Sequence, residues 1–410
     1  MREAKRHLKT GSKNTSTATE VLINVEANLK MKFIHTSDWH IGRQFHNVSL
    51  LEDQRHVLNQ IVTYIEEEKV DALVIAGDIY DRSVPSAAAV DLLDEFINRI
   101  CADINVPVIM IPGNHDGAER LRFGSRQLHS SGLHILGDIT KIDQPVVLSG
   151  AAGNVAFYGI PYNDPETVRN LFETDVASYD EAHTFLVERI KAKREQRQQS
   201  VLISHCFLDG AQESESERPL SIGGADRVSY EPCVDFDYVA LGHLHSPQHK
   251  GKEYIRYSGS ILKYSFSEQN QNKGVTLVEL DTTGLKATKH LPLTALRDMR
   301  LMEGEMQDIL EQGKVDPCND DYLLVRLTDR HAILDPMGKL RAVYPNVLHL
   351  EKPGMLDTGD QTLNPELLKR GELEMFHDFF KQITGQELSE DQDTAIQATL
   401  HEVKQQEAES

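Results

Sequence analysis

The chain has 410 residues, more than one hydrophobic core usually organises, so two or more domains are expected. Its 43 Lys and Arg residues against 64 Asp and Glu residues give a formal net charge of −21, which ordinarily counts against a nucleic-acid partner. It does not exclude local binding, because basic clusters and bound cations can reverse the potential where a phosphate sits. The sequence shows no run as apolar and long as a membrane span, no secretory apolar stretch in residues 1–30 and no C-x-x-C pair among its four cysteines, so a cytoplasmic protein with reduced thiols is expected.

Residues 1–30 form a polar leader with little apolar periodicity, and we expect them to be disordered. The pattern changes abruptly at Met31, where an apolar strand opens with its own methionine. We therefore hypothesise that translation starts at Met31 or that the leader is dispensable. The intact mass of the native protein would test the first version.

From 31 to 285, short apolar runs alternate with amphipathic stretches, which is typical of a layered α/β domain. Strands are expected at Lys32–Thr36, Ala72–Ala76, Val106–Ile111, Val155–Tyr158, Val201–Ser204, Tyr238–Leu241, Tyr254–Tyr257 and Gly274–Leu280. Helical spacing appears at Leu50–Glu68, Ser86–Ile100 and Glu181–Gln196.

Polar clusters follow most of these strands directly, and ligand sites in α/β sheets form beyond the carboxyl ends of strands. The clusters are Asp38-Trp39-His40, Gly77-Asp78, Gly113-Asn114-His115-Asp116, Ser204-His205 and Gly242-His243-Leu244-His245. They offer the oxygen and imidazole ligands that two adjacent divalent ions need, and such a pair cleaves phosphate esters. We therefore expect the clusters to converge on one di-metal site.

The spacing inside each cluster suits this chemistry. Residues two apart in an extended segment point the same way, so Asp38 and His40 can bind one ion, and His243 and His245 repeat the pattern. Asp78 is the natural bridge, since one carboxylate can ligate two ions ~3.5–4 Å apart. Asn114 offers a neutral oxygen, and the adjacent ring of His115 faces the substrate.

Each motif taken singly also has an ordinary structural explanation. A turn aspartate such as Asp78 is usually only a turn former, and a lone histidine such as His205 is more often half-buried and hydrogen-bonded. The five clusters in this order are what make a di-metal site the better interpretation.

Asp116 is expected to orient a neighbour. We expect His35 in the core, Glu213–Glu217 as a solvated patch, and structural or solvated roles for His46, His56, His129, His134, His183 and His249.

A second, smaller module is predicted at 286–351, with alternation at His290–Leu293, helices at Met302–Gln312 and Ala332–Val343, and strands at Tyr322–Leu327 and Val347–Leu350. A Pro/Gly/Asp-rich linker is expected at 352–362. Residues 363–410 then carry two helical patterns, Leu367–Ile383 and Ser389–Val403, with Ser389 suited to a helix N-cap. Two short helices without a core of their own suggest a docking element.

The order of the five clusters resembles that of the calcineurin-like metallophosphoesterases. More closely, His35–Gly42, Ala76–Asp81, Pro112–Asp116 and Asp237–His245 resemble the SbcD family, the nuclease subunits of bacterial SbcCD complexes, from about residue 31 to the C terminus. Residues 376–380 and 385–392 are similar to that family's coiled-coil-binding tail. The resemblance implies an α/β/β/α sandwich with a small α+β capping domain at 286–351 and a helical docking segment at 363–410.

The resemblance also implies ligand sets for two Mn²⁺ ions, although these ligand types would equally permit Fe or Zn. One ion would be held by Asp38, His40, Asp78 and His245, and the other by Asp78, Asn114, His205 and His243. His115 would stabilise the transition state or protonate the leaving 3′ oxygen. Some relatives carry a histidine in the segment where this chain has Asp81, so the role of Asp81 is open.

The activity implied is ATP-dependent 3′ to 5′ exonuclease cleavage of double-stranded DNA and endonuclease cleavage of single strands and hairpins. The chain shows no Walker-type loop, so ATP would be handled by an SMC-like ATPase partner of the SbcC type, with the nuclease as a homodimer in a heterotetramer. If that partner supplies much of the DNA-binding surface, the acidic balance is accounted for. The alternatives are a phosphoesterase acting on small molecules or phosphoproteins, which would have no use for residues 291–410, and a nonenzymatic scaffold, which the complete ligand clusters disfavour.

Overall fold

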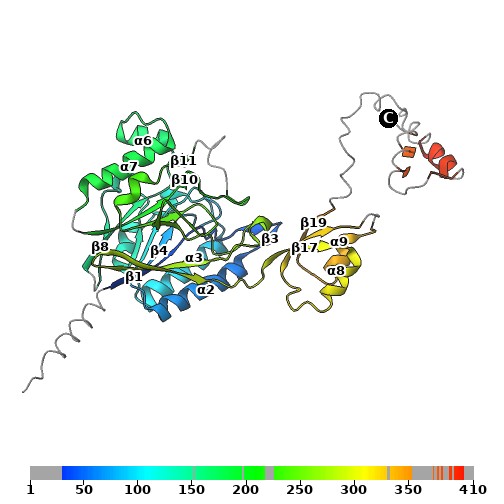
Figure 1. Cartoon of the computed structure of the whole chain (residues 1–410), viewed down its shortest axis with the longest axis horizontal. Helices are drawn as coiled ribbons and strands as arrows, with labels where there is room; N and C mark the ends of the chain where they lie inside the picture. Colours follow the sequence, from blue (N-terminus) through cyan, green and yellow to red (C-terminus); the bar gives the residue numbers. More distant parts are fainter. Residues whose placement is uncertain are drawn as a thin grey trace, which may run out of the picture. The chain divides into compact units, whose positions relative to one another are not determined.

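A computed structural model describes residues 30–150, 153–195, 198–217, 226–329 and 333–352, together with 373, 376–377, 380–381, 387–389 and 392–400. The chain divides into two compact units, Met1–Leu296 and Arg297–Ser410 (Figure 1). The division lies later in the chain than the boundary expected after residue 285. The expected leader, the linker after residue 352 and most of the tail lie outside the described residues.

Two six-stranded sheets form the first unit. One has the strand order β16-β15-β1-β4-β5-β6, with β1 (Lys30–Thr36), β4 (Ala72–Ala76), β5 (Val108–Ile111), β6 (Leu133–Ile135), β15 (Gly274–Asp281) and β16 (Gly284–Pro292). The other has the order β13-β14-β12-β9-β8-β7, with β7 (Val146–Gly150), β8 (Gly153–Ile160), β9 (Gln199–His205), β12 (Tyr238–Gly242), β13 (Gln248–Lys250) and β14 (Lys252–Tyr257). The strands that precede the five polar clusters are joined by parallel pairings within each sheet, β1 to β4 to β5 and β9 to β12.

The core between the sheets follows from the two-residue period of strand side chains. Alternate apolar residues of each strand face the other sheet, among them Met31 and Phe33 of β1 and Val201 and Ile203 of β9. Phe33 packs edge-on against Phe157 and Tyr238, with ring centroids 5.5 and 5.6 Å apart. Each such side chain, fully removed from water, contributes about 1.5–3 kcal/mol to folding.

Helices cover the outer faces of both sheets, α2 (Leu51–Glu68) and α3 (Ala87–Asn98) on one side and α6 (Pro165–Phe172) and α7 (Tyr179–Lys193) on the other (Figure 1). Helix α2 buries residues three and four apart, such as Leu58, Ile61 and Ile65. Ser86 caps α3, and Ser178 caps α7, each by accepting a backbone N–H of the first turn. The predicted α/β/β/α sandwich is therefore confirmed.

Several elements differ in extent from the predicted ones. Helix α3 ends at Asn98 and continues as a π-helical turn over Arg99–Asp103. Short elements without a clear sequence signal are β2 (Gln44–Phe45), β3 (Val48–Ser49), α4 (Ala118–Leu121), α5 (Ser125–Leu128), β10 (Phe207–Leu208) and β11 (Arg227–Val228). Within the described ranges, no helix is both long and apolar enough to cross a membrane.

The second unit contains a parallel three-stranded sheet, β17 (Met299–Gly304), β18 (Tyr322–Leu327) and β19 (Val347–Glu351), with α8 (Met306–Gly313) and α9 (Pro336–Arg341). Two predictions for this region need correction. His290–Leu293 overlaps β16 and so belongs to the first unit. The predicted helix Met302–Gln312 is confirmed from Met306 onward as α8, but its first residues lie in strand β17, because a short apolar run fits either period.

Helix α9 is shorter than the predicted Ala332–Val343. It begins at Pro336 behind Asp335, whose side chain accepts the N–H of Gly338. Proline suits the first helical position but disfavours a helical residue before it, which sets this start. In the tail, Gln392–Leu400 is helical, and Ser389 and Gln392 cap its start reciprocally, each side chain accepting the other's N–H. Ser389 is thus the N-cap that the sequence predicts.

Candidate metal centre

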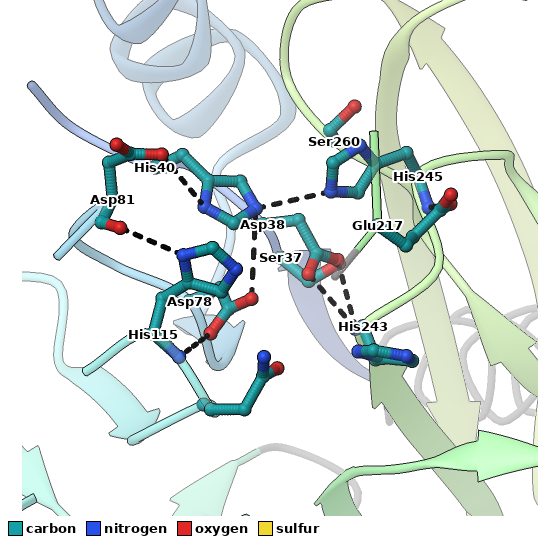
Figure 2. A network of polar contacts seen from close by, with 12 residues as sticks. Ser37, Asp38, His40, Asp78, Asp81, His115, Glu217, His243, His245 and Ser260 are labelled. Carbon is teal, nitrogen blue, oxygen red and sulfur yellow. Dashed lines mark hydrogen bonds and ion pairs between the residues drawn. The ribbon is translucent and has the colours of Figure 1, made fainter. Parts of the chain in front are cut away.

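Residues of the five predicted clusters meet in the first unit, at or just beyond the carboxyl ends of β1, β4, β5, β9 and β12. Figure 2 shows Asp38, His40, Asp78, His115, His243 and His245 among them. The side chains that meet are almost entirely buried, at 0% exposure for Asp38 and His40, 1% for Asp78 and His245, and 2% for His205. Residues that lie far apart in the sequence are therefore brought into one water-poor site.

One group of ligand atoms belongs to Asp38, His40 and His245, all within 4.8 Å of one another. The Nε2 atoms of His40 and His245 are 3.1 Å apart, and Figure 2 shows the two rings pointing toward each other. The Oδ2 atom of Asp78 lies 3.6 Å from Nε2 of His40. This arrangement fits one divalent ion.

A second group lies on the other side of Asp78. Oδ2 of Asp78 is 3.5 Å from Nε2 of His205, and that nitrogen is 2.9 Å from Oδ1 of Asn114. The same carboxylate oxygen thus faces an imidazole from each group, which is the place of a bridging ligand. The ring of His243 lies 5.5 Å from that of His205, centroid to centroid.

The backbone is strained where several of these side chains begin. Positive φ angles occur at Asp38 (54°), His40 (46°), Asp78 (51°) and His243 (106°). Non-glycine residues adopt this region at a cost on the order of 1–3 kcal/mol each, and such strain is concentrated at functional sites. Compensation comes in part from backbone bonds such as His243 N–H to Asp38 Oδ1, at 2.9 Å.

Two glycines allow the loops to approach one another closely. Gly77 has a φ of +92°, and a Cβ there would lie 2.3 Å from Nδ1 of His205. A Cβ on Gly113 would lie 2.2 Å from Oδ1 of Asp78. Any larger residue at either position would displace a side chain of the site.

Burial and neighbouring charges shift the pKa values of the buried groups. Burial raises the pKa of Asp38 to about 6, and burial lowers the pKa of His243 to about 3. Burial also acts to lower the pKa of His205, but the adjacent Asp78 carboxylate outweighs it and raises that pKa to about 9. Two imidazole Nε2 atoms at 3.1 Å can both present lone pairs only to a cation between them, so the residues present fit divalent ions.

His115 borders the centre at 7% exposure, with its ring centroid 4.6 Å from that of His40. Its backbone N–H donates to Oδ1 of Asp78 at 2.9 Å, and its Nδ1 lies 2.8 Å from the carbonyl oxygen of Asp81. A proton on Nδ1 would donate to that carbonyl, leaving Nε2 as the ring nitrogen that can act on a substrate.

Two further aspartates hold the loops in place. Asp116 accepts the N–H groups of Ile79, Tyr80 and Gly113 at 2.9–3.0 Å, so it clamps the loop after β4 to the loop after β5, in line with the expected orienting role. The carboxylate of Asp81 pairs with Arg43 at 3.1 Å and lies 3.8 Å from Nδ1 of His40. The Asp81 carboxylate therefore lies next to the ring of His40, a candidate metal ligand.

Sequence reasoning missed a group of residues around His245. Glu217, expected in a solvated patch, accepts the N–H of His245 at 2.7 Å, and Ser216, Glu268 and Lys273 lie around the same residue. Their spacing carries no signal, although Glu268 lies in a stretch with the apolar Tyr264 and Phe266. His35 is in the core as predicted, bonded to Tyr238 and Leu241.

An α/β/β/α sandwich with buried carboxylates, an amide and imidazoles at the ends of its parallel strands defines the class of metallophosphoesterases. The family model for calcineurin-like phosphoesterases matches residues 31–247, and the model described as the type 5 capsule protein repressor C-terminal domain matches residues 295–384. The chain is 37% identical over 371 residues to the SbcD subunit of the nuclease SbcCD of Staphylococcus epidermidis, covering 90% of this chain and 98% of that protein.

The chain therefore belongs to the calcineurin-like phosphoesterases and, within them, to the SbcD subunits of SbcCD nucleases. Among solved structures it is similar to TT1561 of Thermus thermophilus, covering 63% of this chain and 98% of that one at 14% identity and a TM-score of 0.37. It is also similar to a dimetal phosphatase from Danio rerio, covering 65% and 99% at 14% identity and a TM-score of 0.37. The family and the clustered His and Asp side chains indicate divalent metal ions as cofactors.

Proposed function

We propose that this chain is the nuclease subunit of an SbcCD-type complex and hydrolyses phosphodiester bonds at DNA ends and hairpins. The observation that carries the proposal is the 37% identity to an SbcD nuclease subunit over 98% of that protein's length. The match includes the second unit, which favours the nuclease over a phosphoesterase for small molecules or phosphoproteins. The buried ligand groups around Asp78 support an active enzyme over a scaffold.

The ligand sets follow the two groups around Asp78. One ion would be held by Asp38, His40, Asp78 and His245, and the other by Asp78, Asn114, His205 and His243. The distances of 3.6 and 3.5 Å from Oδ2 of Asp78 to the imidazoles on its two sides support the bridge. Mixed carboxylate and imidazole ligands suit Mn²⁺, which we propose as the working metal.

Ions held by these residues would supply a water of lowered pKa and would offset negative charge on the phosphate. The protein's own part is to hold the ligands rigidly and to present His115. With Nδ1–H donating to the Asp81 carbonyl, Nε2 of His115 can donate to the phosphate or protonate the leaving 3′ oxygen when the ring carries a second proton, and the transfer leaves a neutral imidazole. Burial of the ligands excludes water that would weaken these interactions.

The remaining parts of the chain would serve the complex. We propose that the second unit acts as a capping domain over DNA ends and that residues 363–410 dock onto the coiled coil of an SbcC-type ATPase, in a heterotetramer built on a nuclease homodimer. The family match at 295–384 and the naming of the relative as part of a complex support this. Deleting residues 363–410 should abolish co-purification with the ATPase while Mn²⁺-dependent hydrolysis of a simple phosphodiester persists, and retained co-purification would count against the docking role.

The test of the catalytic proposal is Mn²⁺-dependent cleavage of a hairpin DNA by the full chain, with and without the partner ATPase and ATP. Wild type should cleave, and His115→Gln should lose most of the activity. His249→Gln, at an exposed position outside the metal centre, is the matched control and should cleave like wild type. Equal cleavage by His115→Gln and wild type would refute the role of His115, and no cleavage by wild type with the ATPase would refute the nuclease.

A further inference from the structure

Polar side chains surround both the backbone and the ring of His245. Its N–H donates to Oε1 of Glu217 at 2.7 Å, and its carbonyl oxygen accepts Nζ of Lys273 at 2.8 Å and the N–H of Ser260 at 3.1 Å. Its Nδ1 lies 2.6 Å from Oγ of Ser216 and 3.4 Å from Oε1 of Glu268. The backbone and the side chain of this one residue are therefore fixed together.

Behind His245 lies a charged pair that the proposed chemistry does not itself use. Glu268 is 0% exposed and Lys273 is 6% exposed, and Nζ of Lys273 lies 2.6 Å from Oε2 of Glu268. The same Nζ also donates to Oγ of Ser260 at 2.8 Å and to Oε1 of Gln271 at 2.7 Å. Removing two charges from water is costly, and an apolar pair of similar size is often as stable, so the burial of this pair calls for a functional reason.

Assigning a donor and an acceptor to each hydrogen bond around His245 gives that functional reason. Nε2 of His245 faces His40 and must present a lone pair to bind an ion, so the ring proton belongs on Nδ1. That proton donates to Oγ of Ser216, whose own hydroxyl proton donates to Oε1 of Glu268. The order is therefore imidazole, hydroxyl, carboxylate and ammonium.

We propose that Glu268, paired with Lys273 and acting through Ser216, is a positioning residue that fixes the ring proton and the orientation of His245 for metal binding. A carboxylate behind a ligating histidine makes the imidazole a better donor to the metal, and loss of such a partner typically weakens metal binding about 10–100-fold. The inference rests on the proposed function, because it takes His245 as a ligand of a divalent ion. Glu268 itself does not touch the ion or the substrate.

The contrast with His205 makes the inference specific. Nδ1 of His205 lies 2.9 Å from the backbone carbonyl oxygen of Ala76, which no side-chain substitution removes. Orientation of His205 is thus provided by the fold of β4, whereas orientation of His245 depends on side chains that can be changed one at a time. Changes at Glu268 should therefore affect the ion of Asp38, His40 and His245 and leave the other group intact.

The test is calorimetric titration of the metal-stripped full chain with Mn²⁺ alone, so that no DNA cleavage enters the readout. Wild type should bind two ions. Glu268→Gln should weaken one of the two binding steps about 10–100-fold and leave the other unchanged. Ser216→Ala, which removes one hydroxyl and changes little else, should weaken the same step by a smaller factor.

Two further variants separate positioning from stability. Glu268→Gln/Lys273→Met removes the whole charged pair, so its melting temperature should recover relative to Glu268→Gln while Mn²⁺ binding stays weak. Asp316→Asn in the second unit removes a carboxylate that also pairs with a cation: it bonds Arg300 and Tyr344, and its side chain is 8% exposed. It should lower the melting temperature and leave the Mn²⁺ titration unchanged.

Three results would contradict the positioning role of Glu268, the proposed function or both. Two unchanged binding steps in both Glu268→Gln and Ser216→Ala would overturn the positioning role and leave the proposed nuclease intact. Equal weakening of Mn²⁺ binding by Asp316→Asn would overturn it too, since general destabilisation would then explain the effect. A wild-type chain that binds no Mn²⁺ would overturn the proposed function and, with it, this inference.

Discussion

The second unit and the candidate metal centre of the first unit arrange their charged side chains in opposite ways. In the second unit, charges meet as complementary pairs: Arg300 bonds Asp316 at 3.0 Å and Asp321 at 2.7 Å, and Arg326 bonds Glu351 at 2.9 Å. In the candidate metal centre of the first unit, carboxylates and imidazoles converge on one another instead: Oδ2 of Asp78 lies 3.6 Å from Nε2 of His40 and 3.5 Å from Nε2 of His205. Carboxylates and imidazoles gathered in this way are ligand types that suit a divalent cation.

The metal centre and the second unit also differ in backbone strain. The described residues with positive φ other than glycine include four of the seven proposed ligands, whereas the second unit contributes only Asp335, which caps a helix. Strain that persists at a fully buried site is retained for what the side chains do there. Backbone strain therefore distinguishes the candidate metal centre from the second unit without any comparison with related proteins.

The strongest test of the comparison is Asp78→Asn. The substitution keeps the size of the side chain and suits the positive φ of 51°, but it removes the charge shared between the two proposed ions. We expect Mn²⁺-dependent cleavage to fall on the order of a thousandfold, because both ions lose a ligand. Circular dichroism should show an intact fold, and near-normal cleavage by this variant would contradict the bridging role.

His115→Gln comes next in size. The variant keeps the backbone N–H that donates to Asp78 and loses only the imidazole, so Mn²⁺ titrations should match wild type. The cleavage rate should fall about 10²–10⁴-fold, as for loss of a general acid. Weakened Mn²⁺ binding in this variant would instead make His115 part of the ligand set.

Much of this arrangement could be predicted from the sequence because the ligands are adjacent to strand ends. The apolar runs of β1, β4, β5, β9 and β12 predict strands, and a polar cluster directly after each predicts convergence at one rim. The positions of the proposed metal ligands therefore follow from short patterns in the sequence.

The supporting residues could not be predicted in the same way. Ser216, Glu217, Glu268 and Lys273 come from loops far from His245 in the sequence, and their spacing follows no helical or strand period. The end of the first unit was also misplaced, because β16 presents polar residues such as Lys286, Thr288 and His290 that resemble a connecting loop. Only the pairing of β16 with β15 shows that it belongs to the first unit.

Removal of metal should distinguish the units by stability. An ion that binds only the folded chain stabilises it by about 2.7 kcal/mol at a concentration a hundred times its dissociation constant. Calorimetry with and without a chelator should therefore show a lower melting temperature for the transition of the first unit and no change for that of the second. Equal shifts in both transitions would contradict the assignment of the ions to the first unit alone.

Disruption of a paired charge should have a smaller and purely structural effect. Asp316→Asn weakens bonds to Arg300 and Tyr344, at a cost of about 1–3 kcal/mol. Thermal unfolding should report this loss, with the hydrolysis of a simple phosphodiester unchanged. A loss of hydrolysis matching that of Asp78→Asn would break the contrast between paired and convergent charges.

The smallest expected effect concerns acid sensitivity, which should also differ between the units. His183 of α7 is 5% exposed and bonds Ser204, and burial lowers its pKa from 6.5 to about 4. The folded state therefore favours the neutral ring, so the stability contributed above the unfolded pKa is lost as the pH falls from about 6.5 toward 4. Between pH 7 and 5.5 the loss should be about 1 kcal/mol.

Denaturant titrations of His183→Gln should lack that part of the pH dependence, whereas His349→Gln, at an exposed position in the second unit, should retain it. An unchanged pH dependence in His183→Gln would show that protonation of His183 does not contribute to the acid sensitivity of the first unit.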